Sequence, residues 1–147
     1  MRSLRVRCTK DPLLSVRRSK RWKKRMVYIL VANKSYKYAS GKRSRIIYIG
    51  TTGKGARRPA TSAIDKANAA FGELRGVKEI RVHIATCQGR KATRTWEHLE
   101  SALLATFREM HWELPWYNKR KGSIKNTEDI HLFRPKALKK ILMPFAD

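Results

Sequence analysis

The sequence predicts a small α+β domain in which helices flank a three-stranded antiparallel sheet. Residues 25–32 and 45–50 are apolar at nearly every position, which is typical of short strands covered on both faces. Residues 79–87 alternate apolar and polar side chains and predict a third, more exposed strand. Two longer segments carry apolar residues at the spacing of three and four that indicates amphipathic helices. A chain of 147 residues is long enough for one such domain.

The first two strands are expected to form a hairpin. They read "RMVYILVA" (25–32) and "RIIYIG" (45–50), and a polar, basic connection at 33–44 joins them. A short polar link between two such strands favours antiparallel pairing. Pairing of this kind brings Tyr28 and Tyr48 to one face of the sheet.

The first helix is expected to begin near Pro59, since proline suits the first helical position. Its apolar residues are Ile64, Ala67, Phe71 and Leu74, at spacings of three, four and three. This pattern marks one face of a helix, and that face is expected to lie against the sheet.

The second helix, within residues 93–112, has the clearest pattern. The residues of its apolar face are Trp96, Leu99, Leu103, Phe107 and Met110. A final short helix is expected within residues 134–145. The predicted order is therefore strand, strand, helix, strand, helix, helix.

The charge of the chain points to a polyanionic partner. Lys and Arg number 35 against 11 Asp and Glu, for a formal net charge of +24. Self-repulsion of this size is relieved by nucleic acid, whose phosphates release counterions on binding. An acidic membrane surface is the weaker alternative, and no apolar run approaches the roughly 20 residues of a spanning helix.

The basic residues divide the chain into three parts. Residues 1–25 carry eleven Lys or Arg and are expected to form a basic arm. Residues 26–120 form the predicted core, and residues 121–147 form a C-terminal extension. The arm is also typical of a nuclear address or an organelle transit peptide, and the sequence leaves these readings open.

Cysteine and histidine show no metal-binding pattern. Cys8 and Cys87 lie far apart, and the four histidines have no H-x-x-x-H spacing. Any metal is then expected to have mainly oxygen ligands, which favours Mg²⁺ or Mn²⁺. Two reduced thiols suit an intracellular protein located on nucleic acid, in the cytoplasm or the nucleoid.

Glu100 is a candidate metal ligand. By helical phase it falls inside the apolar arc of the second helix, whereas Glu97 falls outside it. A carboxylate in a buried sector is unfavourable unless it is paired or binds a cation. The structural alternative is an ion pair with one of the many arginines.

Tyr28 and Tyr48 are candidate catalytic residues because both are expected on one face near strand ends. Tyr48 is expected to point away from Ile47 and Ile49. The alternative is that both rings belong to the core and that their hydroxyls bind backbone groups.

Arg57 and Arg58 follow a glycine-containing loop and precede a helix. Arginine contacts phosphate through two nitrogens, and a helix N-terminus adds favourable partial charge for an anion. The alternative is a solvated basic turn.

Taken in order, these segments resemble the GIY-YIG nuclease superfamily. The resemblance covers residues 26–118 and rests on "VYIL" (27–30), "YIG" (48–50), "ESALL" (100–104) and "PWYN" (115–118), with an arginine ten residues after Tyr48. It implies an antiparallel sheet flanked by helices. The residues that it implies as catalytic are Tyr28, Tyr48, Arg58, Glu100 and Asn118, with Gly50 in the second motif and Arg57 as a near rival of Arg58.

The sequence departs from that family at three points. Met26 and Val27 replace the Gly-Ile of the first motif, and the connection at 33–44 is long and basic. Ser62 stands four residues after Arg58, where several members carry a histidine or tyrosine.

The resemblance implies a metal-dependent endonuclease that hydrolyses phosphodiester bonds in double-stranded DNA. Glu100 would hold Mg²⁺ or Mn²⁺. Further contacts to nucleic acid are expected from basic side chains near the motifs, namely Lys34, Lys42, Arg43, Lys54 and Arg57. A non-catalytic basic module, of the ribosome-associated or DNA-packaging type, explains the charge equally well.

Overall fold

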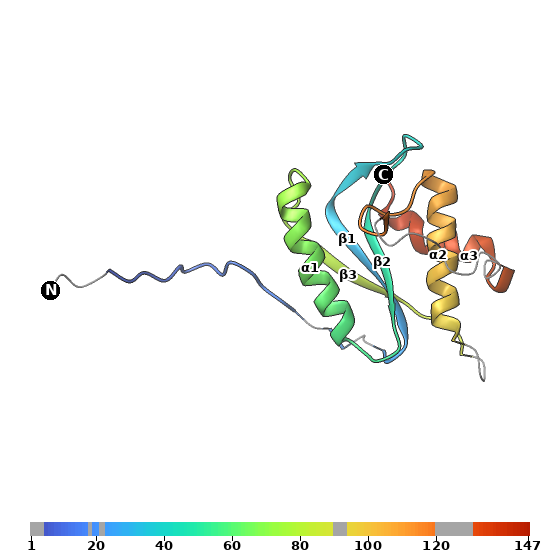
Figure 1. Cartoon of the computed structure of the whole chain (residues 1–147), viewed down its shortest axis with the longest axis horizontal. Coiled ribbons are helices and arrows are strands. Elements are labelled where there is room, and N and C mark those ends of the chain that lie inside the picture. The colour runs from blue at the N-terminus through green and yellow to red at the C-terminus, as the bar shows by residue number, and fades with distance from the viewer. Residues whose placement is uncertain (1–4, 18, 21–22, 90–93, 120–130) are drawn as a thin grey trace.

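The computed structural model describes residues 5–17, 19–20, 23–89, 94–119 and 131–147 (Figure 1). Its elements are β1 (Met26–Lys37), β2 (Arg43–Thr52), α1 (Arg57–Glu73), β3 (Ile80–Ala85), α2 (Thr95–His111), α3 (Pro135–Leu142) and the 3-10 helix η3 (Met143–Phe145). The strands form one antiparallel sheet in the order β2-β1-β3. This arrangement confirms the predicted α+β class and the predicted order of elements.

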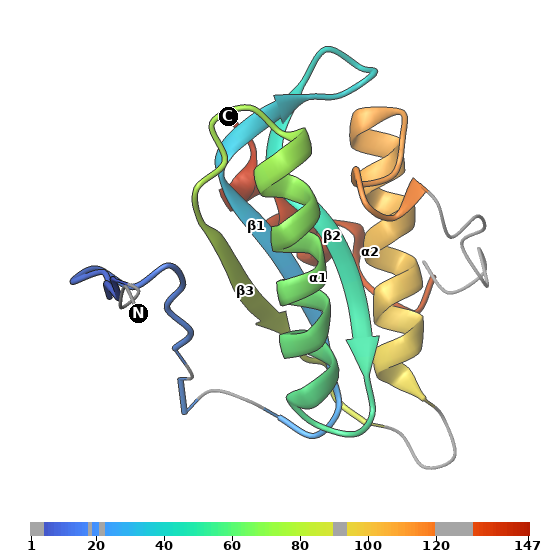
Figure 2. The ribbon, with the colours of Figure 1, turned by 60° about the vertical axis from the view of Figure 1, so that its left-hand side comes forward.

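Helices cover both faces of the sheet, which explains why the first two strands are apolar throughout. Figures 1 and 2 show α1 on one side of the sheet and α2 and α3 on the other. On the α1 side the buried cluster contains Tyr28, Leu30, Ala32, Ile47, Tyr48, Ala70, Leu74, Val77 and Tyr117. On the opposite side it contains Val27, Ile29, Val31, Tyr38, Ile46, Ile49, Ala85, Leu99, Ala102, Leu103, Phe107, Leu138 and Leu142.

An irregularity in the β1–β2 ladder changes the expected alternation. Leu30 pairs with Tyr48, and the next pair joins Val31 to Ile46, so that Ile47 is an additional residue in β2. A bulge of this kind shifts the side-chain alternation by one residue. Ile47 and Tyr48 therefore face α1 together, and the expectation that they point to opposite faces is wrong.

The hairpin strands continue further than predicted. β1 reaches Lys37 and β2 begins at Arg43, so only Tyr38 to Lys42 form the turn. Tyr38 is buried, and its hydroxyl donates to the carbonyl oxygen of Ile46 at 2.6 Å. This internal anchor holds the polar end of β1 beside β2, so the expected long connection at 33–44 is mostly strand.

The face that α1 turns to the sheet differs in part from the predicted one. Ile64 and Phe71 are 52% and 45% exposed, whereas Ala70 and Leu74 are buried. The helix packs through its small residues, and Ser62 on the same side contacts Tyr28, while Ile64 and Phe71 point outwards.

The C-terminal segment belongs to the same fold as the sheet. Leu138 and Leu142 of α3 are buried in the cluster beneath β1 and β2, and Ser44 of β2 forms an isolated bridge with Ala146. By contrast, residues 5–17 are exposed and extend away from the folded body (Figure 1). Across the described parts of the chain, no helix combines the length and apolar character needed to cross a bilayer.

Candidate active site

Tyr28 and Tyr48 lie side by side on adjacent strands. Tyr28 pairs with Gly50, and Tyr48 pairs with Leu30, which makes the tyrosines diagonal neighbours. Their ring centroids are 6.0 Å apart and the rings are tilted by 39°. Tyr28 is fully buried and Tyr48 is 5% exposed. The structure therefore brings the two tyrosines of the sequence motifs together beneath α1.

The rings of Tyr28 and Tyr48 both pack against Gly50. A β-carbon added there would stand 2.6 Å from both Cζ and the hydroxyl oxygen of Tyr28 and 2.7 Å from Cε1 of Tyr48. Such separations are well inside van der Waals contact. The glycine is therefore required because the tyrosine rings occupy the space of any side chain.

The hydroxyl of Tyr28 hydrogen-bonds to Ser62 Oγ of α1 at 2.9 Å. Ser62 is one helical turn after Arg58, so this bond also fixes the side of α1 from which Arg58 projects. Sequence reasoning noted Ser62 only as a departure from the resembled family. Its spacing of four residues from Arg58 was the signal that it belongs to the same side of the helix.

Charged groups from α1 and α2 act on Tyr48. Burial raises the pKa of Tyr48 most, and the Tyr28 hydroxyl and the Glu100 carboxylate raise this pKa further, whereas the charge of Arg58 lowers it. Glu100 and Arg58 therefore lie close enough to Tyr48 to interact electrostatically, although they come from helices on opposite sides of the sheet. The phenol of Tyr48 is accordingly protonated at neutral pH.

Glu97 and Glu100 of α2 differ as their helical phase predicts. Glu100 is half-buried, whereas Glu97 is exposed and forms an ion pair with Arg94 at 3.4 Å. Exposed pairs of this kind contribute little to stability, about 0 to 1 kcal/mol. Glu100 is therefore the half-buried carboxylate of α2 that acts electrostatically on Tyr48.

Asn118 forms hydrogen bonds with the backbone at the outer edge of β2. Its Oδ1 accepts from the backbone N–H of Ile49 at 2.9 Å, and its Nδ2 donates to the Ile49 carbonyl at 2.8 Å. The neighbouring Tyr117 N–H donates to Ile47 O at 2.9 Å. An edge strand would otherwise leave these backbone groups unpaired. Asn118 is thus a positioning residue that holds β2 between Tyr48 and Gly50.

Lys66 is a site residue that sequence reasoning missed. Its Nζ lies 5.0 Å from the centroid of the Tyr48 ring, within the range of a cation–π contact. Arg58, Ser62 and Lys66 follow one another at intervals of four residues and form a polar stripe along α1. That spacing was the available signal, and it was hidden because Ile64 and Phe71 suggested a different buried face.

A cationic rim surrounds the tyrosine end of the sheet. Lys54, Arg57 and Arg58 are exposed in or just after the loop between β2 and α1. The Gly55 N–H donates to the carbonyl of Lys24 at 2.8 Å, which attaches the end of the basic arm to this loop. The guanidinium of Arg25 lies 4.8 Å from the ring centroid of Trp96 in α2.

The remaining predicted nucleic-acid contacts lie elsewhere. Lys34, Lys42 and Arg43 belong to the turn end of the hairpin, whereas Tyr28 and Gly50 pair near its opposite end. The structure therefore separates the five predicted contact residues into two groups at opposite ends of the sheet.

The donor set suits a weakly chelated hard cation. Among the described residues, no three His, Cys, Asp or Glu side chains gather in a way that could hold a metal ion. Mg²⁺ needs fewer protein ligands, because it binds through one or two carboxylates and completes its octahedron with water and substrate phosphate. Glu100 alone is compatible with that mode and not with a structural zinc site.

No protein-family model, curated protein or solved structure matches the chain.

Proposed function

We propose that this protein is a metal-dependent endonuclease that hydrolyses phosphodiester bonds, with double-stranded DNA as its substrate. The observation that carries the proposal is the packing of Tyr28 and Tyr48 against Gly50, within electrostatic reach of Glu100 and Arg58. A structural role for two core tyrosines does not require a carboxylate and a guanidinium from two helices beside them.

Glu100 would hold one Mg²⁺ or Mn²⁺ ion, which when bound neutralises charge on the phosphate and on the leaving oxygen. Arg58 stabilises the negative charge that develops on the phosphate oxygens in the transition state. It is suited to this role because it is exposed at the start of α1, where the helix dipole also favours an anion.

Tyr48 is the tyrosine that faces the substrate, and Tyr28 positions it. Tyr28 is fully buried and its hydroxyl already contacts Ser62, whereas Tyr48 retains some exposure. The raised pKa of Tyr48 makes its hydroxyl a hydrogen-bond donor at neutral pH rather than a base. It therefore orients the attacking water or a phosphate oxygen. A new P–O bond forms to the water, the bond to the leaving oxygen breaks, and the proton that the water loses reaches the leaving oxygen through solvent.

A non-catalytic basic module is the second candidate function. The net charge of +24 favours it as strongly as it favours a nuclease. A non-catalytic function, however, gives no role to the half-buried Glu100 near Tyr48. The two functions make the same prediction for nucleic-acid binding and opposite predictions for cleavage.

The test compares Glu100→Gln with Glu97→Gln, which remove the same charge one helical turn apart. Plasmid DNA and an RNA of similar length are incubated with Mg²⁺, with Mn²⁺ and with EDTA. We expect metal-dependent cleavage of DNA by the wild type and by Glu97→Gln, and none by Glu100→Gln, which still binds DNA in EDTA. Absence of cleavage by the wild type under all conditions favours the non-catalytic module, and cleavage by Glu100→Gln contradicts the assigned site.

A further inference from the structure

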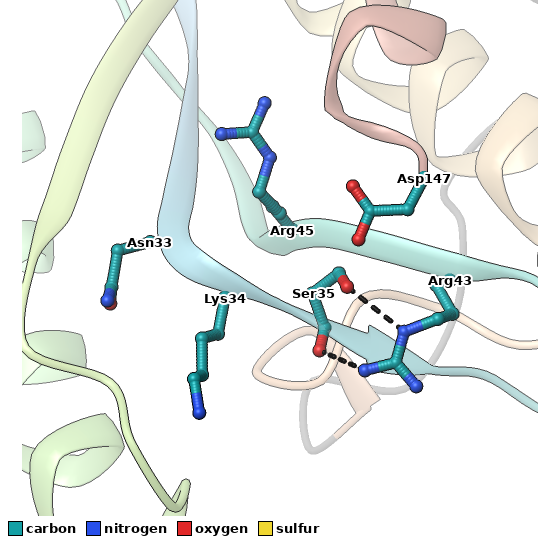
Figure 3. Close-up of a pocket in the computed structure, with 6 residues that line it drawn as sticks. All are labelled: Asn33, Lys34, Ser35, Arg43, Arg45 and Asp147. Carbon is teal, nitrogen blue, oxygen red and sulfur yellow. Dashed lines mark hydrogen bonds between the residues drawn. The ribbon is translucent and has the colours of Figure 1, made fainter.

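An open pocket lies at the turn end of the hairpin, away from the tyrosines. Its volume is about 500 Å³, and it is lined by Asn33, Lys34, Ser35, Arg43, Arg45 and Asp147 (Figure 3). Pockets for small ligands of this size are mostly apolar with a few polar groups. Here every lining residue is polar or charged, and three of the six are cationic, which excludes an apolar ligand and favours an anionic one.

The protein itself holds the two arginines in position. Arg43 donates from Nε to Ser35 Oγ at 3.0 Å and from Nη2 to the Ser35 carbonyl at 2.8 Å. Arg45 donates from Nη2 to the Pro144 carbonyl at 3.2 Å, while its buried Nε has no hydrogen-bond partner among the described residues. Neutral oxygens orient both guanidinium groups without cancelling their charge, so the fixed cations are available to an anion.

Lys34 extends the cationic surface towards the end of α1. Its side chain passes Gly76, where an added β-carbon would stand 2.6 Å from Nζ. Figure 3 shows Lys34 and Arg45 pointing in opposite directions from the two strands, with Arg43 directed onto Ser35. The cations are therefore spread along an open surface rather than gathered around one point, and this spacing suits a chain of phosphates better than a single small anion.

A second, adjacent pocket shares Asn33 and Arg45 with the first. It has a volume of about 330 Å³ and adds Arg81 and His83 of β3, with Glu79 beside them. Glu79 pairs with Arg81 at 2.7 Å. The pKa of His83 is lowered by burial and then by the charges of Arg81 and Arg45, so His83 is neutral at neutral pH and, among the described residues, Arg45 supplies the unpaired positive charge of this pocket.

We propose that Lys34, Arg43 and Arg45 form a second anchor for the phosphate backbone of nucleic acid, separate from the tyrosine site. The proposal concerns binding alone and does not depend on cleavage. Asp147, whose carboxylate lines the same pocket, opposes binding by repelling the phosphates.

The first test is a triple variant, Lys34→Gln, Arg43→Gln and Arg45→Gln. Its control is Lys136→Gln, Lys139→Gln and Lys140→Gln, which removes the same charge from exposed positions of α3. Affinity for a 20-base-pair duplex is measured in EDTA between 50 and 300 mM salt. Each neutralised phosphate contributes about 0.9 to the log–log slope, so we expect the loss of three cations to flatten the slope by up to about 2.7 and to weaken binding at least about tenfold. An equal effect of the control variant overturns the proposal.

The second test changes affinity in the opposite direction. Asp147→Asn removes the carboxylate from the pocket, and we expect duplex binding about two- to fivefold tighter at low salt, because a nearby repulsion is removed. Glu109→Gln, an exposed position on α2, is the matched control. A change no larger than that of the control overturns the proposal, and this variant decides alone if thermal melting shows that the triple variant is unfolded.

These readouts separate the anchor from the proposed nuclease. If the wild-type chain binds DNA through the pocket but never cleaves it, the proposed phosphate anchor is supported and the proposed nuclease function is contradicted. If the chain cleaves DNA but the pocket variant binds as tightly as its control, only the proposed anchor is contradicted.

Discussion

The hydroxyl of Tyr28 and the hydroxyl of Ser62 are joined by a hydrogen bond of 2.9 Å that connects the central strand to α1. The two residues are 34 positions apart in the sequence. Because Tyr28 is fully buried, its partner Ser62 lies on the side of α1 that faces the sheet, together with Ala70. Arg58 and Lys66, one turn before and one turn after Ser62, are thereby directed to the tyrosine end of the molecule.

Removing either hydroxyl should destabilise the protein by a similar amount. Tyr28→Phe and Ser62→Ala each break the same bond, and we expect each to lower the free energy of unfolding by about 1 kcal/mol. The double variant should lose little more than either single variant, since the bond can be broken only once. Chemical denaturation of all four proteins measures this coupling, and strictly additive losses would show that the bond contributes nothing.

Tyr48→Phe should separate the catalytic role from the structural one. Ring packing is retained, so stability should change by only about 1 kcal/mol. If the hydroxyl orients the reacting groups, the single-turnover cleavage rate should fall by about 10²–10⁴. The control is Tyr38→Phe, which removes a buried hydroxyl bound to Ile46 O at the other end of the hairpin and should lower stability without lowering the rate. A fully active Tyr48→Phe protein would show that the Tyr48 hydroxyl has no catalytic role and that the residue is structural.

Gly50→Ala should be strongly destabilising although alanine is otherwise a mild change. The new methyl group would overlap both tyrosine rings, and overpacking of a well-packed interior costs about 1–3 kcal/mol. Gly72→Ala in α1 is the matched control, because an added β-carbon there meets nothing within 4 Å. That control should be neutral or stabilising by up to about 1 kcal/mol through helix propensity. Thermal or urea unfolding of both variants decides the point, and equal stability of the two would be inconsistent with the packing described.

Asn118→Ala should loosen the outer edge of β2. It leaves the N–H and the carbonyl of Ile49 without their side-chain partner, and each unsatisfied buried group costs about 1–3 kcal/mol. Amide exchange at Ile49 should accelerate, while exchange at Ile29 in the central strand should change only as far as global stability does. Asn118→Asp keeps one acceptor but loses the donor, so it should not restore wild-type protection. Unchanged exchange at Ile49 in the alanine variant would mean that water replaces Asn118 at little cost.

Acidification should destabilise the fold through His111. This histidine is buried between the rings of Tyr38 and Phe107. Its pKa is lowered first by burial and then by the charge of Lys42, with Glu113 acting in the opposite direction. The unfolded state, with a histidine pKa near 6.5, therefore binds the proton more readily, and stability is complete above about pH 6.5 and declines as the pH falls towards the folded pKa.

The comparison of His111→Gln with the wild type measures this contribution. The variant should lose less stability than the wild type between pH 7.5 and pH 5.5, even if its stability at neutral pH is lower. His131→Gln, at an exposed position, should retain the wild-type pH dependence. Parallel pH profiles for His111→Gln and the wild type would assign the acid sensitivity to other groups, such as His83.

Local periodicity was sufficient to predict the elements and part of the candidate site. The apolar runs and helical spacings specified three strands and three helices in the correct order, because those patterns repeat within single elements. The helical phase of α2 also distinguished half-buried Glu100 from exposed Glu97 without knowledge of the fold.

The contacts that assemble the site depend on segments distant in sequence, and these only the tertiary structure decided. The bulge at Ile47, which turns Ile47 to the same face as Tyr48, arises from how β2 fits against β1. The rotation of α1, which exposes Ile64 and Phe71 and directs Lys66 to Tyr48, follows from packing against the sheet. Periodicity shows which faces an element has, but packing against other elements decides which face is buried. In α1 the side with polar and small residues is buried because it fits over the tyrosines.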